Sequence, residues 1–260
     1  MKKRSSISIF QSVVHALFLR EVQTRFGTKK LGYLWAIIDP FTQIFLFATL
    51  KTALHDRGMP GIDYVVFLAT SFLTYNLFKH VMTNSMSAFN ANKMLFNYKQ
   101  VKPFDTIVSR FVLEFLIFGV AVIIFMSIGI YFEFDLTVKD FNMVLLTVLW
   151  ISVFAFGIGL LFAVLSSFYE SFSKIISYIT MPLFFISGLF YTAGSLPPEI
   201  REILLYNPIL HFIEMIHGNY FLVLDTQYVD YEYMMYWTFL PLFFGLYFYI
   251  NSEKKIISSL

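Results

Sequence analysis

Long apolar stretches alternate with short polar ones along the chain, and six of them have the length of a membrane-spanning helix. Such a helix needs about 20 mainly apolar residues to cross the hydrocarbon core. The six stretches are about Leu31–Thr52, Ile62–Met82, Asp105–Phe132, Phe141–Leu165, Ile175–Tyr191 and Tyr233–Ile250. No repeat or flexible linker separates them. The pattern predicts an all-α integral membrane protein with six transmembrane helices in a single domain, residues 1–260.

Residues 5–28, ahead of the first stretch, show a different pattern. Apolar side chains recur there at helical i, i+3, i+4 spacing, namely Ile7, Phe10, Val14, Leu17 and Phe18. This spacing is typical of an amphipathic helix that lies in the membrane interface with its apolar face toward the lipid. We therefore predict an N-terminal interfacial helix. The alternative is a helix whose apolar face packs against the bundle.

The segment between the fifth and sixth stretches contains Ile203–Leu224, which is apolar enough to suggest a seventh span. It also carries an Asn-Pro pair, a glycine and three ionisable side chains, which disrupt a helix or are costly in lipid. We predict instead that residues 192–232 form an external re-entrant segment. Its two short helices would dip into the membrane without crossing it, buried in protein or beside water.

Composition and charge support a lipid environment and give an orientation. Hydrophobic residues make up 58% of the chain and charged residues 14%, against about 25% charged in a soluble domain. On the two sides that six spans define, thirteen Lys and Arg residues fall on the side of the N-terminus and four on the other. The positive-inside rule therefore places both termini in the cytoplasm. The net charge of +2 gives no indication of nucleic-acid binding.

Motifs for several kinds of chemistry are missing from the sequence. There is no G-x-x-x-x-G-K-[ST] phosphate loop, no H-E-x-x-H, no G-x-S-x-G, no D-x-D and no cysteine. The nearest approach to a metal site is His211, Glu214 and His217, but helical steps of three residues spread these side chains around the axis. We favour the polar lining of a re-entrant helix and expect no metal or cofactor on this chain.

Among the ionisable residues within predicted spans, we single out Asp39 in the first, and Arg110 and Glu114 near the start of the third. Charged side chains in a membrane usually face the bundle interior and pair with one another. We predict intramembrane pairing of these residues, including a contact between Asp39 and Arg110, in preference to a role in transport.

Small residues follow one stripe of the fourth stretch. Ala155, Gly159 and Ala163 recur every four residues, with Ser152 and Ser166 close to the same stripe. Small side chains let helices approach closely in a membrane. The stripe predicts helix packing.

Aromatic residues are abundant, with 33 Phe, 16 Tyr and 3 Trp. Sugar rings have apolar C–H faces that stack on aromatic rings, so a path lined by such residues can hold a glycan without fixing it. Most of the aromatic residues are expected in interface belts and on lipid-facing surfaces. The candidates for a glycan path lie on polar-bearing spans or near their mouths: Trp35, Tyr64, Tyr75, Tyr178 and Tyr191.

Three stretches together resemble the ABC-2 type exporter permeases. "FLREVQTRFGTKKLGYLWAIIDP" has the R-E-x-x-x-R…L-G-x-x-W-x-x-x-x-P pattern of the family's N-terminal segment. "NYKQVKPFDTIVSR" is similar to its cytoplasmic loop, most of all in the capsular polysaccharide subgroup. "SGLFYTAGSLPPEIREILLYNPILHFIEMIHGNYF" is similar to its external segment, with His217 where the family often has Arg.

The resemblance implies six spans, a homodimer and a separate cytoplasmic ATPase subunit that binds ATP and Mg. It identifies residues 86–103 as the cytoplasmic coupling segment, with Lys93, Met94, Leu95, Phe96 and Tyr98 contacting the ATPase. Apolar residues in a cytoplasmic loop favour a protein partner, although the loop could instead rest on lipid headgroups. The resemblance also implies an interfacial gate at Arg20, Glu21 and Arg25.

These features together predict the inner-membrane permease subunit of an ATP-driven exporter of lipid-linked capsular polysaccharide. The resemblance alone implies a periplasmic or inner-membrane co-polymerase adaptor. The alternatives within the family are permeases for another lipid-linked glycan, of O-antigen or teichoic-acid type, or for a drug. A membrane-embedded glycosyltransferase is disfavoured because no carboxylate cluster is present. A secondary transporter is disfavoured because deep ionisable residues are lacking.

Overall fold

The computed structural model describes residues 5–26, 32–53 and 60–259, and every regular element in these ranges is a helix. The all-α prediction is confirmed. The elements are α1 (Ser6–Phe26), α2 (Gly32–Ala53), α3 (Tyr64–Met86), α4 (Ala88–Asn92), η1 (Lys93–Asn97), α5 (Pro103–Tyr131), α6 (Phe141–Phe168), α7 (Glu170–Ile186), η2 (Ala193–Ser195), α8 (Pro198–Leu204), α9 (Pro208–Tyr220) and α10 (Tyr231–Ser259).

Each of the six predicted apolar stretches forms a helix, namely α2, α3, α5, α6, α7 and α10. Among the described residues, α3, α5, α6 and α10 are long and apolar enough to cross a membrane, and α7 contains a shorter apolar helix. Side-chain caps define where helices begin. Asp63 accepts a hydrogen bond from the Val65 amide at the start of α3 (2.9 Å), and Asp140 does the same for Met143 in α6 (3.1 Å).

The centre of the bundle is α3, which packs against α2, α5, α6 and α9. Rings from three helices stack in a row through the core: the Phe78 and Phe154 centroids are 5.3 Å apart, and those of Phe154 and Phe212 are 5.2 Å apart. Buried aromatic rings contribute large apolar areas and prefer such offset arrangements. The row joins α3, α6 and α9, which are distant in sequence.

The small-residue stripe on α6 serves packing, as predicted. Ala155 and Ala163 are fully buried. A Cβ atom placed on Gly159 would lie 2.8 Å from the Cβ of Ser85 on α3, closer than such atoms normally approach. A side chain at position 159 would therefore push α3 and α6 apart.

Two other glycines bring α6 and α10 together. A Cβ on Gly157 would lie 3.0 Å from the backbone nitrogen of Leu242, and a Cβ on Gly245 would lie 3.0 Å from the backbone nitrogen of Leu161. Because the obstructing atoms belong to backbone, neither contact can be relieved by rotating a side chain. The two helices thus touch almost backbone to backbone.

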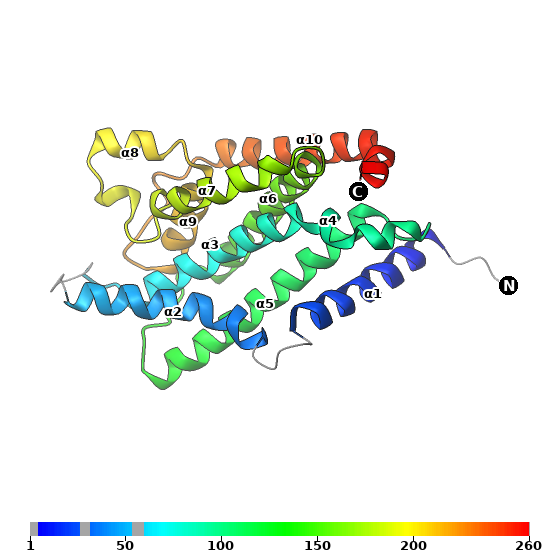
Figure 1. The fold of residues 1–260 in the computed structure, drawn as a ribbon. Helices are drawn as coiled ribbons and strands as arrows, with labels where there is room; N and C mark the ends of the chain where they lie inside the picture. Colours follow the sequence, from blue (N-terminus) through cyan, green and yellow to red (C-terminus); the bar gives the residue numbers. More distant parts are fainter. Residues whose placement is uncertain (1–4, 27–31, 54–59, 260) are drawn as a thin grey trace.

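The beginning of α1 and the end of α10 lie at the same end of the bundle as α4, and α8 lies at the opposite end (Figure 1). Helix α1 runs beside α5 (Figure 1). Leu17 is buried there, whereas Ile7 and Phe10, on the apolar face expected to meet lipid, are exposed. The second half of α1 therefore follows the alternative that the sequence left open, packing against the bundle.

Residues 192–232 contain the two expected short helices, α8 and α9, and not one continuous spanning helix. Asn207 separates them and caps α9 by accepting a hydrogen bond from a backbone amide. Helix α9 is buried along nearly its whole length and packs against α3 and α6. The loop before α6 covers its C-terminal end, where Lys139 Nζ donates to the Gly218 carbonyl (3.1 Å).

Candidate transport site

Helix α1 is attached to the bundle by buried charged groups, which we call the α1 clasp: Arg20, Glu21, Arg25 and their partners. Arg110 of α5 donates from Nε to Glu21 Oε1 (2.8 Å), and both side chains are buried. The same guanidinium donates from Nη1 to the Asn84 carbonyl (2.7 Å). Glu21 therefore neutralises a cation that is also hydrogen-bonded to the backbone of α3, as buried charges require.

Two further contacts complete the clasp. Arg20 donates to Asn92 Oδ1 at 2.7 Å, and Asn92 Nδ2 in turn lies 3.2 Å from Glu21 Oε1. Arg25 forms an ion pair with Glu114 of α5. All three residues that the resemblance marks as an interfacial gate thus bind α4 or α5.

The predicted contact between Asp39 and Arg110 is wrong. Arg110 is occupied by Glu21 and α3, and the Asp39 carboxylate accepts a hydrogen bond from Gln43 one turn further along α2 (3.4 Å). The physical reason is that α1 packs beside α5 and offers a nearer acid. Arg110 and Glu114 are paired as expected, but their partners are on α1.

The coupling segment has an outer and an inner face. Met94 and Tyr98 expose 73% and 66% of their surface, and Lys93 is also exposed. Phe96 exposes only 8% and packs into a core cluster that includes Phe89, Ile107 and Tyr249. The prediction that Phe96 faces the ATPase is therefore wrong, because its ring is a buried anchor of the segment.

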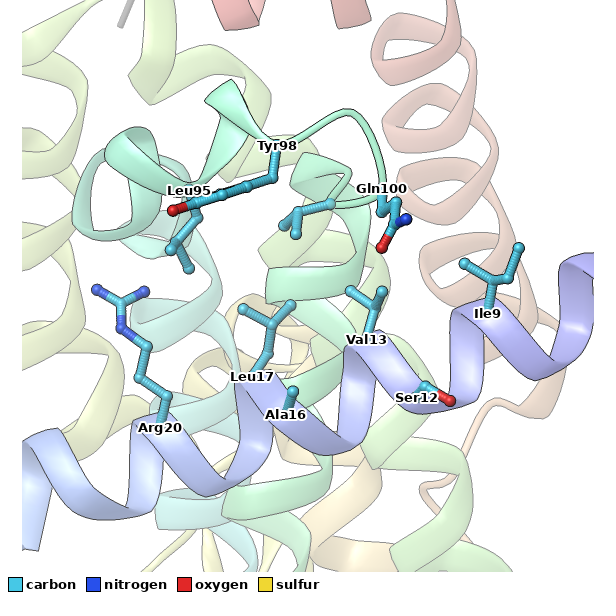
Figure 2. Close-up of a pocket in the computed structure, with 10 residues that line it drawn as sticks. Ile9, Ser12, Val13, Ala16, Leu17, Arg20, Leu95, Tyr98 and Gln100 are labelled. Atoms are coloured by element: carbon cyan, nitrogen blue, oxygen red, sulfur yellow. The ribbon is translucent and has the colours of Figure 1, made fainter. Parts of the chain in front are cut away.

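A groove of about 610 Å³ separates α1 from the coupling segment, and we call it the α1–η1 groove. Figure 2 shows Val13 and Leu17 reaching into it from α1, with Leu95 and Tyr98 facing them from the coupling segment. Arg20 lies at one end of the groove. The clasp and the coupling segment are therefore neighbours.

A second groove, of about 460 Å³, opens between α2, α3 and α7, and we call it the α2–α3–α7 groove. Its wall combines aromatic rings, hydroxyl groups, an amide and one cation. The lining residues are Gln43, Phe47, Tyr75, Lys79, Thr83, Ser177, Thr180, Met181, Phe184 and Phe185.

The aromatic candidates for a glycan path separate into different environments. Tyr75 lines the α2–α3–α7 groove, and its hydroxyl donates to the Thr180 carbonyl (3.0 Å). Tyr178 exposes 81% of its surface outside the groove lining. Tyr191 donates to the Phe185 carbonyl (3.3 Å), and the Lys51 ammonium lies 3.4 Å from the centre of the Tyr64 ring. The side chain of Trp35 lies outside the described residues.

Sequence reasoning missed Lys79 and the phenylalanines of this groove. A usable signal existed for the lysine, because Tyr75 and Lys79 are four residues apart and therefore share a helix face. The phenylalanines carried no such signal, since their pattern does not distinguish a groove from a lipid-facing surface.

On α9, the three residues weighed as a metal site bind separate protein groups. His211 Nε2 lies 2.8 Å from the Leu205 carbonyl, Glu214 accepts a hydrogen bond from the Ala193 amide (2.7 Å), and His217 Nε2 lies 2.8 Å from Ser71 Oγ. No metal-binding group of three ligands is found among residues 5–26, 32–53 and 60–259.

Burial is the main cause of the shifted pKa values of Glu214 and His217 on α9. It raises the pKa of Glu214 to about 7, against the opposing effect of the Ala193 hydrogen bond, and it lowers the pKa of His217 to about 3. His217 is therefore neutral. Its ring stacks on that of Phe67, with the ring centroids 4.1 Å apart.

Comparison with known proteins places this helical bundle in a class of membrane transporter. The profile of the ABC-2 type transporter family matches residues 12–221. The chain belongs to the ABC-2 type transporter family, as the sequence resemblance indicated.

Similar proteins match from three quarters to nearly all of the chain. The polysialic acid transport protein KpsM of Escherichia coli is 34% identical over 260 residues, covering 98% of this chain and 99% of that protein. The capsule polysaccharide export inner-membrane protein CtrC of Neisseria meningitidis serogroup B is 27% identical, covering 93% and 91%. The O-antigen export system permease protein RfbA of Klebsiella pneumoniae is 23% identical, covering 75% and 74%.

Proposed function

We propose that this chain is the inner-membrane permease subunit of an ATP-driven exporter that moves lipid-linked capsular polysaccharide from the cytoplasm to the periplasm. The observation that carries the proposal is the match to a polysialic acid transport protein along 98% of this chain. The α2–α3–α7 groove supports it, since aromatic rings and hydroxyl oxygens are suited to the C–H faces and hydroxyls of sugars.

In this proposal α2, α3, α5, α6, α7 and α10 cross the membrane, with both termini in the cytoplasm. Helices α8 and α9 lie on the periplasmic side, where a co-polymerase adaptor would bind. The distribution of Lys and Arg supports this orientation. So does the position of α4 at the same end of the bundle as the beginning of α1 and the end of α10 (Figure 1).

The ATPase is a separate subunit that carries ATP and Mg and docks on the coupling segment. Met94 and Tyr98 provide exposed apolar surface for it. Because Arg20 of α1 donates to Asn92 within this segment, force on the segment would reach the α1 clasp. Two copies of the chain would form the path, which opens beside α2 and α7 when the ATPase subunits close.

The direct test is ATP-dependent uptake of polysaccharide into inverted membrane vesicles that contain this chain and its partner ATPase. We expect uptake to require both chains and to stop when the ATPase cannot hydrolyse ATP. Uptake by this chain alone, driven by an ion gradient, would refute the proposal.

Export of an O-antigen is the second candidate, favoured by the similarity to the RfbA permease. The same vesicles distinguish the two when they are supplied with each lipid-linked glycan in turn. The capsular proposal requires faster uptake of the capsular substrate.

A further inference from the structure

Lys79 is a half-buried lysine at the wall of a groove, and no neighbouring group among the described residues neutralises its charge. It lies within α3, half-buried, and it lines the α2–α3–α7 groove. Seven residues separate it from the end of α3, a distance of about 10 Å along the helix axis. Across the described part of the chain, its ammonium group makes no ion pair or hydrogen bond.

An unpaired cation on a membrane-spanning helix is costly and marks a binding site or a transport path. The charges of α5 make the contrast clear, since Arg110 is paired with Glu21 and Glu114 with Arg25. Lys79 therefore keeps three N–H donors available at the wall of a groove.

The hydroxyl groups beside Lys79 are already used as hydrogen-bond donors within their own helices. Thr83 donates to the Lys79 carbonyl (2.8 Å), Ser177 to the Ser173 carbonyl (2.9 Å) and Thr180 to the Ile176 carbonyl (2.7 Å). Their protons are used within their own helices, so toward the groove these oxygens act as acceptors. Positive charge toward a ligand comes from Lys79.

We propose that Lys79 binds an anionic oxygen group of the transported molecule in the α2–α3–α7 groove, namely the carboxylate of an acidic sugar or the phosphate of the lipid carrier. The inference rests on the proposed function and specifies its substrate class as anionic. Phe47, Phe184 and Phe185 offer apolar faces, and the hydroxyl oxygens accept from sugar hydroxyls. This combination favours the acidic sugar.

A structural partner for Lys79 is the competing explanation. Asp39 on α2 is the candidate, since its carboxylate accepts a hydrogen bond from Gln43, which lines the same groove. If Lys79 served to neutralise Asp39, removing either charge would have the same effect. Asp39→Asn therefore belongs in the experiment.

The test uses the purified complex of this chain with its ATPase. Three fluorescent probes are titrated: a sialic acid oligomer, the same oligomer with its carboxyls reduced to alcohols, and a polyprenyl phosphate. Lys79→Gln is compared with Lys79→Arg, which keeps the charge. Lys174→Gln, at an exposed lysine of α7, is the matched control.

We expect Lys79→Gln to weaken binding of the acidic oligomer about tenfold, as for loss of a hydrogen bond to a charged group. Binding of the reduced oligomer should change less than twofold, and Lys79→Arg and Lys174→Gln should bind like the unmodified protein. A selective tenfold loss for the polyprenyl phosphate would support the proposal and assign the anion to the lipid carrier.

Three results would overturn the inference: Lys79→Gln binding all probes like the unmodified protein, equal losses for the acidic and reduced oligomers, or the same losses in Asp39→Asn. Co-elution with the ATPase shows that each variant assembles. If the unmodified complex binds none of the probes, the proposed function itself fails, which separates the two failures.

Discussion

The α1 clasp and the α2–α3–α7 groove both involve α3, yet the charged side chains of the clasp are paired and, within the part of the chain that the structure describes, the lysine of the groove is not. In the clasp, Arg110 and Glu21 are buried against each other, and the guanidinium also reaches the α3 backbone. In the groove, Lys79 has no partner among the described residues. A paired charge holds helices in place, whereas an unpaired one is available to a ligand. The difference distinguishes the structural charges of this bundle from those available for transport.

The largest expected effect comes from breaking the clasp. Arg110→Met would leave the buried Glu21 carboxylate unpaired and cost about 3–5 kcal/mol of stability. We expect a large fall in the melting temperature of the detergent-solubilised protein, measured by fluorescence-detected size exclusion after heating.

The double variant Glu21→Gln, Arg110→Met provides the control for the clasp. Removing both charges should recover much of the lost stability, because no uncompensated ion remains. Equal melting temperatures for Arg110→Met and the unmodified protein would contradict the structural role of the pair.

The two faces of the coupling segment give the next largest effect. Phe96→Ala empties part of a buried cluster and should cost about 3 kcal/mol. Tyr98→Ala, at an exposed ring two residues away, should change stability by less than about 0.5 kcal/mol while reducing ATPase binding. Melting temperature and co-purification with the ATPase measure the two effects. A normal ATPase interaction in a folded Tyr98→Ala variant would count against docking at this face.

A smaller effect is expected from the buried acid on α9. Burial raises the pKa of Glu214 in the folded protein to about 7, so the folded state holds a proton that the unfolded chain loses near its ordinary value of 4.5. The contribution of this proton to the free energy of unfolding is therefore fully present below pH 4.5. It falls as pH rises toward 7, by up to about 1 kcal/mol per pH unit. Glu214→Gln should flatten this dependence, measured as melting temperature between pH 5 and 7.5.

Only a small effect on stability is expected at Lys79. Because no partner is lost, Lys79→Gln should change stability by less than about 1 kcal/mol, while uptake of an acidic glycan falls. This is the opposite of Arg110→Met, which should lose stability first. A drop in melting temperature as large as that of Arg110→Met would show that Lys79 is paired in the folded protein and would remove the contrast.

Much of the fold could be predicted from the sequence because length and periodicity determine which segments become helices. The stretch about Phe141–Leu165 became α6, Phe141–Phe168, and its small residues do pack against a neighbour. The break at Asn207 was also predictable, since an Asn-Pro pair both ends one helix and caps the next.

The ion-pair partners of buried charges, and the direction in which the side chains of a loop face, were harder to predict. Periodicity shows that Arg110 must find a buried partner, but not that α1 would supply Glu21 before Asp39 could. An apolar residue in a polar loop meets either a partner protein or the chain's own core. Phe96 and Tyr98 lie two residues apart and differ in this respect, a distinction that depends on the packing of α5 and α6.

The glycines between α6 and α10 have a consequence for how the molecule moves. Gly157 and Gly245 bring the two backbones so close that neither helix can slide along or rotate past the other without a collision of main-chain atoms. We therefore expect α6 and α10 to move as a unit. Because α6 also packs against α3, we expect the α2–α3–α7 groove to widen by displacement of its other two walls, α2 and α7.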